Sequence, residues 1–473
     1  MAGESVVEPT GTVFHPRGRV AVAGLGASGR AALEVLAGKG IDAIGVDDHL
    51  DNAVRSDQLE LAGLDWLVVS PGWPPSSPLV KRAGAAGVTI ISEVELAWRY
   101  RANRAANWLV LTGTNGKTTT VEMLHQMLMA AGRVAVAAGN VGNPLVTAVQ
   151  DPAVSDFAVE LSSFQLHYTA SLQPVAAAML NLAPDHLDWH GSFQAYAAAK
   201  ARVFRGVQRA VVFNRDDPIS RELAMAADAG PEVLRVGFTL HEPELGEVGI
   251  ADGHLLDRAF SEVRELAKLD DLVQLAGSTS QRLGMVHQLP AHQVANALAA
   301  AALGLAAGIG PHSISQGLRA FTPGAHRLEE VAQINGVRYV NDSKATNPHA
   351  AAAALKGFAD GSVVWIAGGL AKGLEFDDLI KQVKHKLKAT VLIGADQTAF
   401  TKALEQHAPG LAHCQVQRAH TGAVMDQAVA QAARLAGPGD VVLLAPAAAS
   451  MDQFADYQAR GSAFTQAVQR LGV

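Results

Sequence analysis

The chain has 473 residues, a formal net charge of −7 and a single cysteine, Cys414. Because that length exceeds one ordinary domain core, we expect about two to four domains. The negative charge argues against a general nucleic-acid or anionic-membrane binder, so anionic ligands must be held by local sites. One cysteine excludes a disulfide framework and a cysteine-cluster metal site, and favours the reducing cytoplasm. The longest apolar stretch, Val294–Ile309, is short for a membrane span and predicts a small-residue helix inside a core.

Residues 19–72 predict a Rossmann-like domain. Arg19–Gly29 is an apolar strand that runs into a Gly-x-Gly-x-x-Gly turn, and a helical pattern follows to about Lys39. A second strand ends at the acids Asp47 and Asp48, about twenty residues past the glycines. Such a domain binds phosphates at a helix N-terminus and a hydroxyl group on the acid. An NAD(P) cofactor and a nucleotide sugar both satisfy that chemistry.

The segment after Trp108 predicts a strand, a phosphate loop and a helix. The apolar run stops at Gly113-Thr-Asn-Gly116, which is followed by Lys117 and three threonines. We expect backbone N–H groups around Gly113–Gly116 to converge on phosphate oxygens, Lys117 to reach the β- and γ-phosphates, and Thr118 to bind Mg²⁺. A helix starting near Thr119 adds its positive N-terminal end. The strict pattern has a further glycine where this chain has Leu111, and a plain turn is the alternative interpretation.

The order of elements predicts three α/β domains. A polar segment ends near residue 105, and strands then alternate with helices through Asp156–Glu160, Ala176–Leu180 and Ala210–Asn214. Turn-forming residues after Phe321 indicate a second linker. Further apolar runs follow it, at Val363–Ala367, Ala389–Ile393 and Asp440–Leu444. We therefore predict a Rossmann-like domain over 1–105, a central phosphate-loop α/β domain over 106–322 and a Rossmann-like α/β domain over 323–473.

Carboxylates and histidines follow two strands of the predicted central domain. Glu160 ends its strand and, with a phosphate-loop threonine, suits a hard cation such as Mg²⁺; a surface acid is the alternative. The loop Asn181–Gly191 carries two Asp and two His residues, which suit a second Mg²⁺ better than structural zinc. Lys200 lies on a predicted helix over Phe193–Val203, where a solvated lysine is the commonest interpretation.

Two loops of the predicted third domain combine acids, amines and hydroxyls. Asn341-Asp-Ser-Lys-Ala-Thr-Asn347 follows a strand at Val337–Val340 and precedes an alanine-rich helix. Ala445–Ser450 follows the strand at Asp440–Leu444 in the same way. The helix N-terminus and Lys344 are suited to anionic oxygens, although either loop is also compatible with a simple helix cap.

Together these motifs resemble the Mur ligases, the ATP-dependent amide-forming enzymes of peptidoglycan precursor synthesis. The resemblance covers roughly residues 18–470, and Gly113–Thr118 is that superfamily's form of the phosphate loop, shared with folylpolyglutamate synthases. The more specific motifs are similar to those of the branch that adds D-glutamate. They are Glu160–Leu166, Asn181–Asp188 with Lys200 downstream, Asn341–Asn347 and Ser450–Phe454.

The resemblance implies a role for individual residues. The nucleotide-sugar contacts would be Ala27, Ser28, Asp47, Asp48, Gly72 and Asn140. The ATP contacts would be Gly113, Thr114, Asn115, Gly116, Lys117, Thr118, Thr119 and Asn296, with Arg327 and Asp342 from the third domain. The Mg²⁺ ligands would be Thr118, Glu160, His186 and Lys200, the last as a carbamate. The D-glutamate contacts would be Thr346, Lys372, Ser450 and Tyr457. The catalytic set would be Lys117, Glu160, His186, Lys200 and Lys344.

The reaction implied is acyl activation of UDP-N-acetylmuramoyl-L-alanine by ATP, followed by attack of the D-glutamate amine, in a cytoplasmic monomer that inserts into no membrane. Two residues depart from the family pattern: Ala448 replaces a frequent cysteine and Tyr457 a frequent phenylalanine. The alternatives are a sibling Mur ligase, a folylpolyglutamate synthase-like ligase, an NAD-dependent dehydrogenase and a non-catalytic nucleotide switch. The dehydrogenase leaves the phosphate loop unexplained, and the switch has no use for the cluster at Asp185–Asp188.

Overall fold

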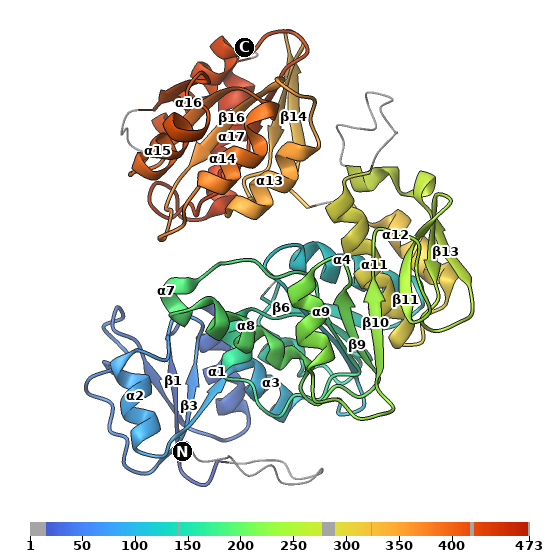
Figure 1. The fold of residues 1–473 in the computed structure, drawn as a ribbon. Coiled ribbons are helices and arrows are strands. Elements are labelled where there is room, and N and C mark those ends of the chain that lie inside the picture. Colours follow the sequence, from blue (N-terminus) through green and yellow to red (C-terminus); the bar gives the residue numbers. More distant parts are fainter. Residues whose placement is uncertain (1–15, 141, 277–288, 323, 417–420, 472–473) are drawn as a thin grey trace. The chain divides into compact units, whose positions relative to one another are not determined.

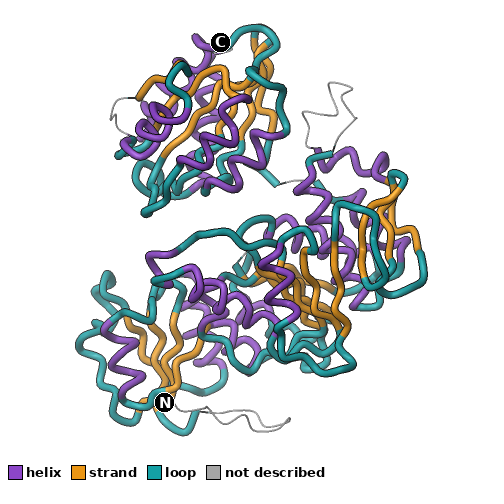
Figure 2. The backbone as a smooth tube through the Cα atoms, in the orientation of Figure 1, coloured by secondary structure: helices purple, strands orange, loops and turns teal. Residues whose placement is uncertain are grey.

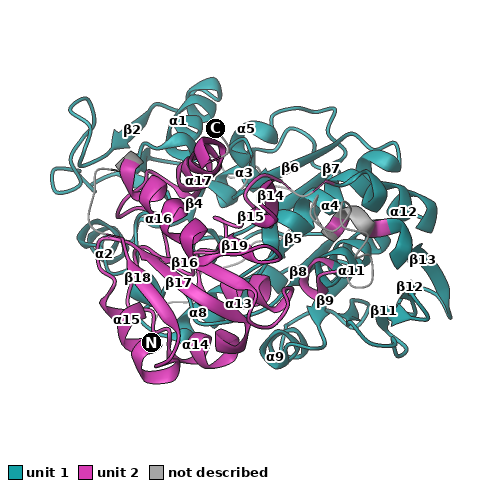
Figure 3. Cartoon of the chain, turned by 90° about the horizontal axis from the view of Figure 1, so that it is seen from above, with its two compact units in different colours: residues 1–271, 294–321 teal, residues 272–293, 322–473 magenta. Residues whose placement is uncertain are grey.

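The chain forms two compact units in a computed structural model that describes residues 16–140, 142–276, 289–322, 324–416 and 421–471. Unit 1 comprises residues 1–271 and 294–321, and unit 2 comprises residues 272–293 and 322–473 (Figure 3). Within the described ranges, no helix combines the length and apolar character needed to cross a membrane. Both units are α/β structures, in which helices cover sheets whose strands are mostly parallel.

The first sheet of unit 1 has four parallel strands in the order β2-β1-β3-β4. Alternate residues of β1 point to opposite faces, so Val20 and Val22 share a core with α1 and α3, while Ala21 and Ala23 pack with α2 (Figure 1). Burial on both faces explains why its central strands are continuously apolar. The elements are β1 (Arg19–Ala23), α1 (Ala27–Gly38), β2 (Ala43–Val46), β3 (Leu64–Val69), α2 (Pro78–Ala85), β4 (Thr89–Ser92) and α3 (Glu93–Tyr100).

The second sheet of unit 1 has nine strands in the order β13-β12-β11-β10-β9-β8-β5-β7-β6. The pairs from β6 to β11 are parallel, and β11 to β13 form an antiparallel extension. The strands are β5 (Asn107–Thr112), β6 (Ala135–Gly139), β7 (Asp156–Glu160), β8 (Ala176–Met179), β9 (Ala210–Asn214), β10 (Leu234–Phe238), β11 (Glu247–Ala251), β12 (His254–Asp257) and β13 (Arg264–Lys268).

Helices surround this second sheet (Figure 2). Two of them, α4 and α12, pack closely against each other, because Gly317 of α12 lets the two helix backbones approach. The α-helices are α4 (Lys117–Ala130), α5 (Leu145–Ala148), α6 (Ser163–His167), α7 (Leu187–His190), α8 (Phe193–Ala201), α9 (Pro218–Met225), α11 (Ala291–Ala306) and α12 (Pro311–Ala320). Two 3₁₀ segments are η1 (Arg202–Phe204) and η2 (Leu269–Ala276).

Unit 2 contains a six-stranded sheet in the order β14-β15-β19-β16-β17-β18, parallel except for β14. One face packs on α13, α14 and α15, and the other packs on α16 and α17. The strands are β14 (Glu329–Ile334), β15 (Val337–Asn341), β16 (Val363–Gly368), β17 (Leu387–Ile393), β18 (Ala412–Gln415) and β19 (Val441–Leu444). The helices are α13 (Pro348–Lys356), α14 (Asp377–Val383), η3 (Lys384–Lys386), α15 (Thr398–His407), α16 (Thr421–Leu435) and α17 (Tyr457–Leu471).

Most expected elements are present within a few residues of their predicted bounds. The helix expected over Val294–Ile309 is α11, and the helix expected from Thr119 begins at Lys117. The antiparallel strands β11 to β13 have no counterpart among the expected elements. They carry few apolar residues, and only some of these are buried, so the sequence contains no long apolar run there.

Candidate active site

The phosphate loop joins β5 to α4 and is closed by its last glycine. Gly116 has φ +82°, which favours glycine, and a Cβ at this position would lie 2.3 Å from the side-chain oxygen of Asn296. The predicted adenine contact Asn296 therefore lies directly against the phosphate loop. Lys117 donates hydrogen bonds from Nζ to the carbonyl oxygens of Gly113 and Thr114, at 2.9 and 3.0 Å. A lysine held over its own loop is suited to contact the phosphates of a bound nucleotide.

Asn181 fastens the phosphate loop from the end of the neighbouring strand β8. The N–H of Thr114 donates to the Asn181 carbonyl at 3.0 Å, and the N–H of Asn115 donates to Asn181 Oδ1 at 2.9 Å. The Thr114 hydroxyl is also used internally, since it accepts from the N–H of Ala183 at 3.0 Å. In this structure Asn181 therefore occupies the N–H groups of Thr114 and Asn115, and their expected contact with phosphate stays a prediction. The remaining donors lie at Gly116 and in the first turn of α4, which contains Thr118 and Thr119.

Glu160 is a buried side chain with one oxygen that accepts no hydrogen bond from the described residues. Its side chain accepts a hydrogen bond from Asn140 Nδ2 at Oε1, at 3.1 Å, while Oε2 has no hydrogen-bond partner among the described residues. Asn140 is held close because Gly139 precedes it: a Cβ on Gly139 would lie 2.1 Å from the Glu160 carbonyl oxygen. A buried anionic oxygen is costly unless a cation or a donor compensates it. Glu160 Oε2 therefore suits a metal ion.

Lys200 is only 2% exposed, which excludes the solvated helix lysine suggested by its position in the sequence. Nζ donates to the Thr112 hydroxyl at 3.1 Å and to the Gly113 carbonyl at 2.8 Å, and lies 5.0 Å from the ring centre of Tyr196. Burial, reinforced by the charge of Lys117, lowers the pKa of Lys200 well below its usual value. The unprotonated amine favoured by this environment is the form that reacts with carbon dioxide to give a carbamate.

His186 lies at the start of the short helix α7, in the left-handed region with φ 52°. Its Nε2 atom lies 3.7 Å from an Asp185 oxygen, and its ring packs against Phe164, 4.8 Å between centres. Across the described residues, no group of three or more His, Cys, Asp or Glu side chains is placed to hold a metal ion. A metal site here would therefore need further oxygen ligands besides Glu160 and His186, such as the Thr118 hydroxyl or the oxygens of a bound ligand.

The glycine-rich turn of the first sheet is shaped by close backbone contacts. A Cβ on Gly29 would lie 2.0 Å from the Gly24 carbonyl oxygen, so α1, which begins at Ala27 and Ser28, packs tightly on β1. Asp47 accepts from the N–H of Leu25 at 2.9 Å. Hydrogen bonds from this N–H and from that of His49 lower the pKa of Asp47.

Asp48 is engaged in a similar way. Its two oxygens accept from the N–H and the hydroxyl of Ser56, each at 2.8 Å, and these bonds lower its pKa. Asp47 and Asp48, the acids predicted to bind a ligand hydroxyl, therefore already accept hydrogen bonds from their own surroundings. A ligand hydroxyl would share their carboxylate oxygens with these protein donors.

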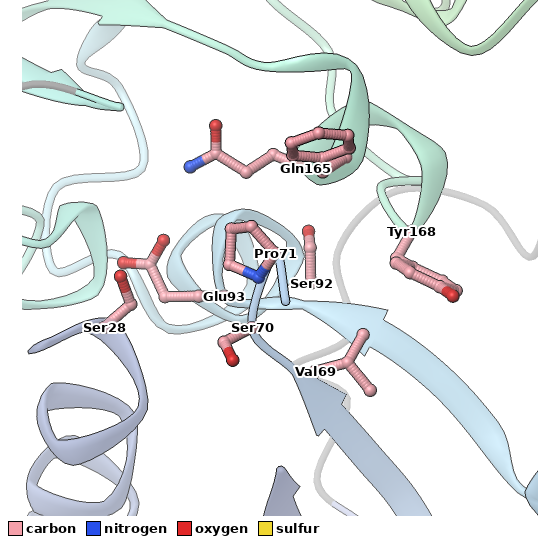
Figure 4. Close-up of a pocket in the computed structure, with 9 residues that line it drawn as sticks. Ser28, Val69, Ser70, Pro71, Ser92, Glu93, Gln165 and Tyr168 are labelled. Atoms are coloured by element: carbon pink, nitrogen blue, oxygen red, sulfur yellow. The ribbon is translucent and has the colours of Figure 1, made fainter. Parts of the chain in front are cut away.

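A narrow pocket opens beside the glycine-rich turn, between the two sheets of unit 1 (Figure 4). Ser28 lies at its edge, and Gly72 directly follows the lining residue Pro71. A Cβ on Gly72 would meet no atom within 4 Å, so the space over this glycine is open. The lining residues are Ser28, Val69, Ser70, Pro71, Ser92, Glu93, Phe164, Gln165 and Tyr168.

In unit 2, Arg327 and Asp342 lie near each other at the end of β15. Asp342 accepts from the N–H of Leu328 at 3.3 Å. Burial raises the pKa of Asp342 to about 7, although the Leu328 N–H and the Arg327 guanidinium act in the opposite direction. A carboxyl group whose pKa is close to neutral pH gains or loses its proton easily when a cation or a hydroxyl group approaches.

The loop carrying Lys344 is held by the first turn of α17. Lys344 Nζ lies 3.8 Å from the ring centre of Tyr457, and the Ser343 hydroxyl donates to the Tyr457 carbonyl at 2.8 Å. Arg460, which is fully buried, donates to the Ser343 carbonyl and to the Ala448 carbonyl, both at 3.0 Å. A single guanidinium thus joins the loop after β15 to the loop after β19.

The other predicted amino-acid contacts lie on adjoining loops. The loop after β16 pairs with the loop after β19 through Leu370, whose N–H donates to the Ala449 carbonyl at 2.8 Å. Lys372 and Ser450 follow these two residues, and Ser450 is 3% exposed. The N–H of Thr346 donates to the Lys344 carbonyl at 2.8 Å, which places Thr346 on the same loop. The structure therefore brings these residues to one edge of the sheet of unit 2.

Three supporting residues were not predicted from the sequence. Tyr196 lies four residues before Lys200 on α8, and this spacing on one helix face is a signal that could have revealed it. Asn181 begins the motif Asn181–Asp188, but its partners Thr114 and Asn115 lie far away along the chain. Arg460 has no local signal, because an arginine in a helix is usually exposed.

Comparisons with known proteins agree with this arrangement. A sequence profile described as "Mur ligase middle domain" matches residues 111–304, and one described as "Mur ligase, glutamate ligase domain" matches residues 326–448. A protein of Streptomyces coelicolor named "UDP-N-acetylmuramoylalanine--D-glutamate ligase" is 47% identical, over 96% of this chain and 98% of its own length. A protein of the same name from Frankia casuarinae is 48% identical, over 95% of this chain and 93% of its own length.

A solved structure has the same fold at low sequence identity. The pseudomurein peptide ligase type C from Methanothermus fervidus superposes with a TM-score of 0.59 at 17% identity, covering 96% of this chain and all of that chain. Identity this low shows the fold alone, whereas the two relatives above exceed 45% identity over nearly their whole length. The chain therefore belongs to the Mur ligase family, and within it to the group of UDP-N-acetylmuramoylalanine--D-glutamate ligases.

Proposed function

We propose that this chain joins D-glutamate to UDP-N-acetylmuramoyl-L-alanine, with ATP as co-substrate and an acyl phosphate as intermediate. The observation that carries the proposal is the buried amine of Lys200 at the base of the phosphate loop, in a protein whose full-length relatives bear the name of this ligase. A buried lysine amine is costly to keep charged, and conversion to a carbamate turns it into a ligand for a cation. A dehydrogenase or a simple nucleotide switch would have no use for that group.

The reaction has two steps, in which the leaving group is first ADP and then inorganic phosphate. A carboxylate oxygen of the L-alanyl group attacks the γ-phosphorus of ATP, and ADP leaves with the electrons of the broken P–O bond. The D-glutamate amine then attacks the acyl carbon, loses a proton, and inorganic phosphate leaves. Lys117 stabilises the charge on the phosphates, and the first turn of α4 supplies backbone donors. Asn296, against Gly116, orients the nucleotide base.

Mg²⁺ fits the residues around Glu160, as its uncompensated buried oxygen indicates. Thr118, Glu160, His186 and the carbamate of Lys200 would hold it, and it would neutralise negative charge on the phosphates during transfer. Asn140 keeps Glu160 Oε1 occupied with a hydrogen bond, which leaves Oε2 for the cation. His186 is aligned by Phe164 and by its own left-handed backbone.

The three parts of the chain divide the substrates between them. Residues 1–105 hold the UDP-sugar at Ala27, Ser28, Asp47, Asp48 and Gly72, and residues 106–322 hold ATP. Residues 323–473 hold D-glutamate through Thr346, Lys372, Ser450 and Tyr457, with Lys344 beside the Tyr457 ring. Arg327 and Asp342 from the same part contact the nucleotide. We propose that the protein acts as a monomer.

The decisive experiment measures phosphate release with UDP-N-acetylmuramoyl-L-alanine, ATP and a panel of amino acids. Release is expected with D-glutamate and is expected to be about a thousandfold or more slower with L-glutamate, because inversion leaves a buried partner of a carboxylate unpaired. Release with meso-diaminopimelate in place of D-glutamate would assign the chain to a sibling ligase. Release that needs no UDP-sugar would contradict the proposal.

A further inference from the structure

The turn Ser70-Pro71-Gly72-Trp73, here called the Pro71 loop, connects the first sheet of unit 1 to the proposed nucleotide-sugar site. It begins where β3 ends, and the N–H of Trp73 donates to the Ser70 carbonyl at 3.2 Å, which closes the turn. Gly72 at its tip is exposed and has open space above it. The position of this turn depends on the donors that bind its carbonyl oxygens. A ligand that contacts Gly72 therefore depends on those donors as well.

Two aromatic side chains from the second sheet's helices hold those carbonyl groups. Trp189 of α7 donates from its indole N–H to the Pro71 carbonyl at 3.2 Å. The Tyr168 hydroxyl, at the end of α6, donates to the Trp73 carbonyl at 3.3 Å. Gly72 is thus flanked on both sides by carbonyl groups bound to one cluster of rings. Tyr168, Pro71 and Ser70 line the same pocket (Figure 4).

The rings form a continuous cluster, here called the aromatic cluster. Trp189 lies 4.8 Å from Phe164, 5.4 Å from His167 and 4.4 Å from His190, between ring centres. Burial lowers the pKa values of His167 and His190 to about 4, so both rings are neutral at neutral pH. These half-buried, uncharged rings touch one another, so a displacement of one ring acts directly on its neighbours.

The other end of the cluster lies at the proposed metal ligands. Phe164 packs against His186, 4.8 Å between ring centres, and follows Glu160 by four residues. Trp189 and His186 also share the single turn of α7, where the Trp189 N–H donates to the His186 carbonyl at 3.2 Å. A displacement of the Trp189 indole therefore acts on His186 through both the backbone and the ring of Phe164.

We propose that Trp189 is a positioning residue that couples occupancy of the Pro71 loop to binding of the metal-nucleotide complex at His186. The inference rests on the proposed function, because it takes Gly72 as a nucleotide-sugar contact and His186 as a metal ligand. When a nucleotide sugar fixes the Pro71 loop, the Pro71 carbonyl fixes the indole N–H, and the turn of α7 then holds His186 ready for the metal. By linkage, the metal-nucleotide complex tightens nucleotide-sugar binding by the same factor.

The test is a thermodynamic cycle on the full-length protein. UDP serves as the probe for the first site, and its dissociation constant is measured by calorimetry with and without Mg²⁺ and a non-hydrolysable ATP analogue. We expect the analogue to tighten UDP binding by about fivefold or more in the unaltered protein, within the usual range of coupling between sites. Trp189→Phe keeps a ring but removes the N–H donor. In this variant the ratio of the UDP dissociation constants without and with the analogue should be close to one. The affinity for each ligand alone should change by less than about twofold.

Trp98→Phe is the matched control. Trp98 lies on α3, where its ring packs against Trp108 and beneath the Arg101 guanidinium, so this indole should be dispensable for the coupling. If Trp189→Phe fails to fold, Phe164→Leu interrupts the same chain of contacts at its next member and should give the same loss. Coupling that survives in a folded Trp189→Phe or Phe164→Leu variant, or that is absent from the unaltered protein, overturns the inference. Failure of UDP to bind at all would instead contradict the proposed nucleotide-sugar site.

Discussion

At Lys200 a stability cost is combined with the catalytic role proposed for this side chain. Its amine is 2% exposed, and its hydrogen-bond acceptors are the Thr112 hydroxyl and the Gly113 carbonyl. Lys200→Met replaces the amine by an apolar side chain of similar length. We expect this variant to melt at a higher temperature, because it removes a buried ionisable group. We also expect it to lose about a hundredfold or more of its phosphate-release rate, because a metal ligand is missing.

Chemical rescue tests the second half of this prediction. In Lys200→Ala, which leaves a space beside the phosphate loop, added formate or acetate should restore part of the rate by supplying the missing carboxylate. Calorimetric melting curves of both variants give the stability. A Lys200→Ala variant with normal phosphate release would show that the amine is only a structural hydrogen-bond donor.

Glu93 and Glu95 lie on the same helix, α3, yet have opposite pKa shifts. Glu93 accepts from the N–H of Val146 at 2.6 Å and caps α5, and burial raises its pKa to about 7 in spite of its bonds to backbone N–H groups. Burial also acts to raise the pKa of Glu95, but the Arg99 guanidinium and the Ser171 hydroxyl outweigh it, so that this pKa is lowered.

The sign of the pH dependence follows from these shifts. Folded Glu93 binds a proton more tightly than unfolded Glu93, so its contribution to stability is complete below about pH 4.5 and is lost as the pH rises through about 7. Glu93→Gln imitates the protonated acid at every pH. We expect it to match the unaltered protein at pH 4 and to exceed it by about 3 kcal/mol at pH 8.5.

Denaturant unfolding at both pH values measures the difference. Glu95→Gln is the matched control on the same helix. It should destabilise the protein at pH 8.5 and less so at pH 4, because the carboxylate of Glu95 is the form that binds Arg99 and Ser171. A Glu93→Gln variant that is less stable than the unaltered protein at pH 8.5 would show that Glu93 is ionised when folded.

At the scale of elements, the contact between α4 and α12 supports the phosphate loop. A Cβ on Gly317 would lie 2.4 Å from Met127 Cα and 2.5 Å from Met127 N, so only glycine allows the two helices to pack at this distance. We expect Gly317→Ala to cost about 1 to 3 kcal/mol of stability, because the clash is with backbone and cannot be relieved by a side-chain rotation. Since α4 begins at Lys117, the KM for ATP should also rise.

Gly304 in α11 provides the contrasting substitution. A Cβ there would meet its nearest atom at 3.5 Å, which is ordinary contact. Gly304→Ala should therefore stabilise the protein by about 0.5 to 1 kcal/mol, the usual gain from replacing glycine inside a helix. Thermal melting and ATP kinetics of the two variants compare them directly. Equal effects of the two substitutions would show that α12 moves away from α4 at little cost.

Elements with a local signature were predictable from the sequence, and contacts between distant segments were not. The strand, loop and helix from Trp108 to Ala130 follow from apolar periodicity and glycine positions, which are local properties. The use of the Thr114 and Asn115 N–H groups by Asn181 depends on β8 lying beside β5, which no short segment encodes. Sequence reasoning places Lys200 on a helix but gives no indication of its burial, for the same reason.

At the scale of the whole molecule, unit 2 has hydrophobic cores of its own on both faces of its sheet. Trp365 belongs to one core and Phe464 to the other, and both are fully buried. These cores lie entirely within residues 337–468. We expect a fragment of residues 324–473 to fold by itself, because a domain of this size buries enough apolar surface to offset its conformational entropy.

A cooperative melting transition and native-like circular dichroism of the fragment would check this. Trp365→Ala should abolish the transition, since it removes the largest buried side chain from the core, with an expected cost of about 3 to 5 kcal/mol. A fragment that melts without cooperativity, while the full-length protein melts cooperatively, would show that unit 2 depends on the rest of the chain.

The hydrogen bonds of Arg460 connect segments that are synthesised at different times. This guanidinium joins the loop after β15 to the loop after β19, and it follows Ser343 by 117 residues along the chain. At translation rates of about 5 to 20 residues per second, roughly 6 to 23 seconds separate the appearance of the Lys344 loop from that of the arginine that holds it. During this interval the nascent chain already contains the phosphate loop, but Arg460 does not yet hold the loops after β15 and β19 in place. We therefore expect a ribosome-bound intermediate to form the phosphate loop before the loops after β15 and β19 are held in place.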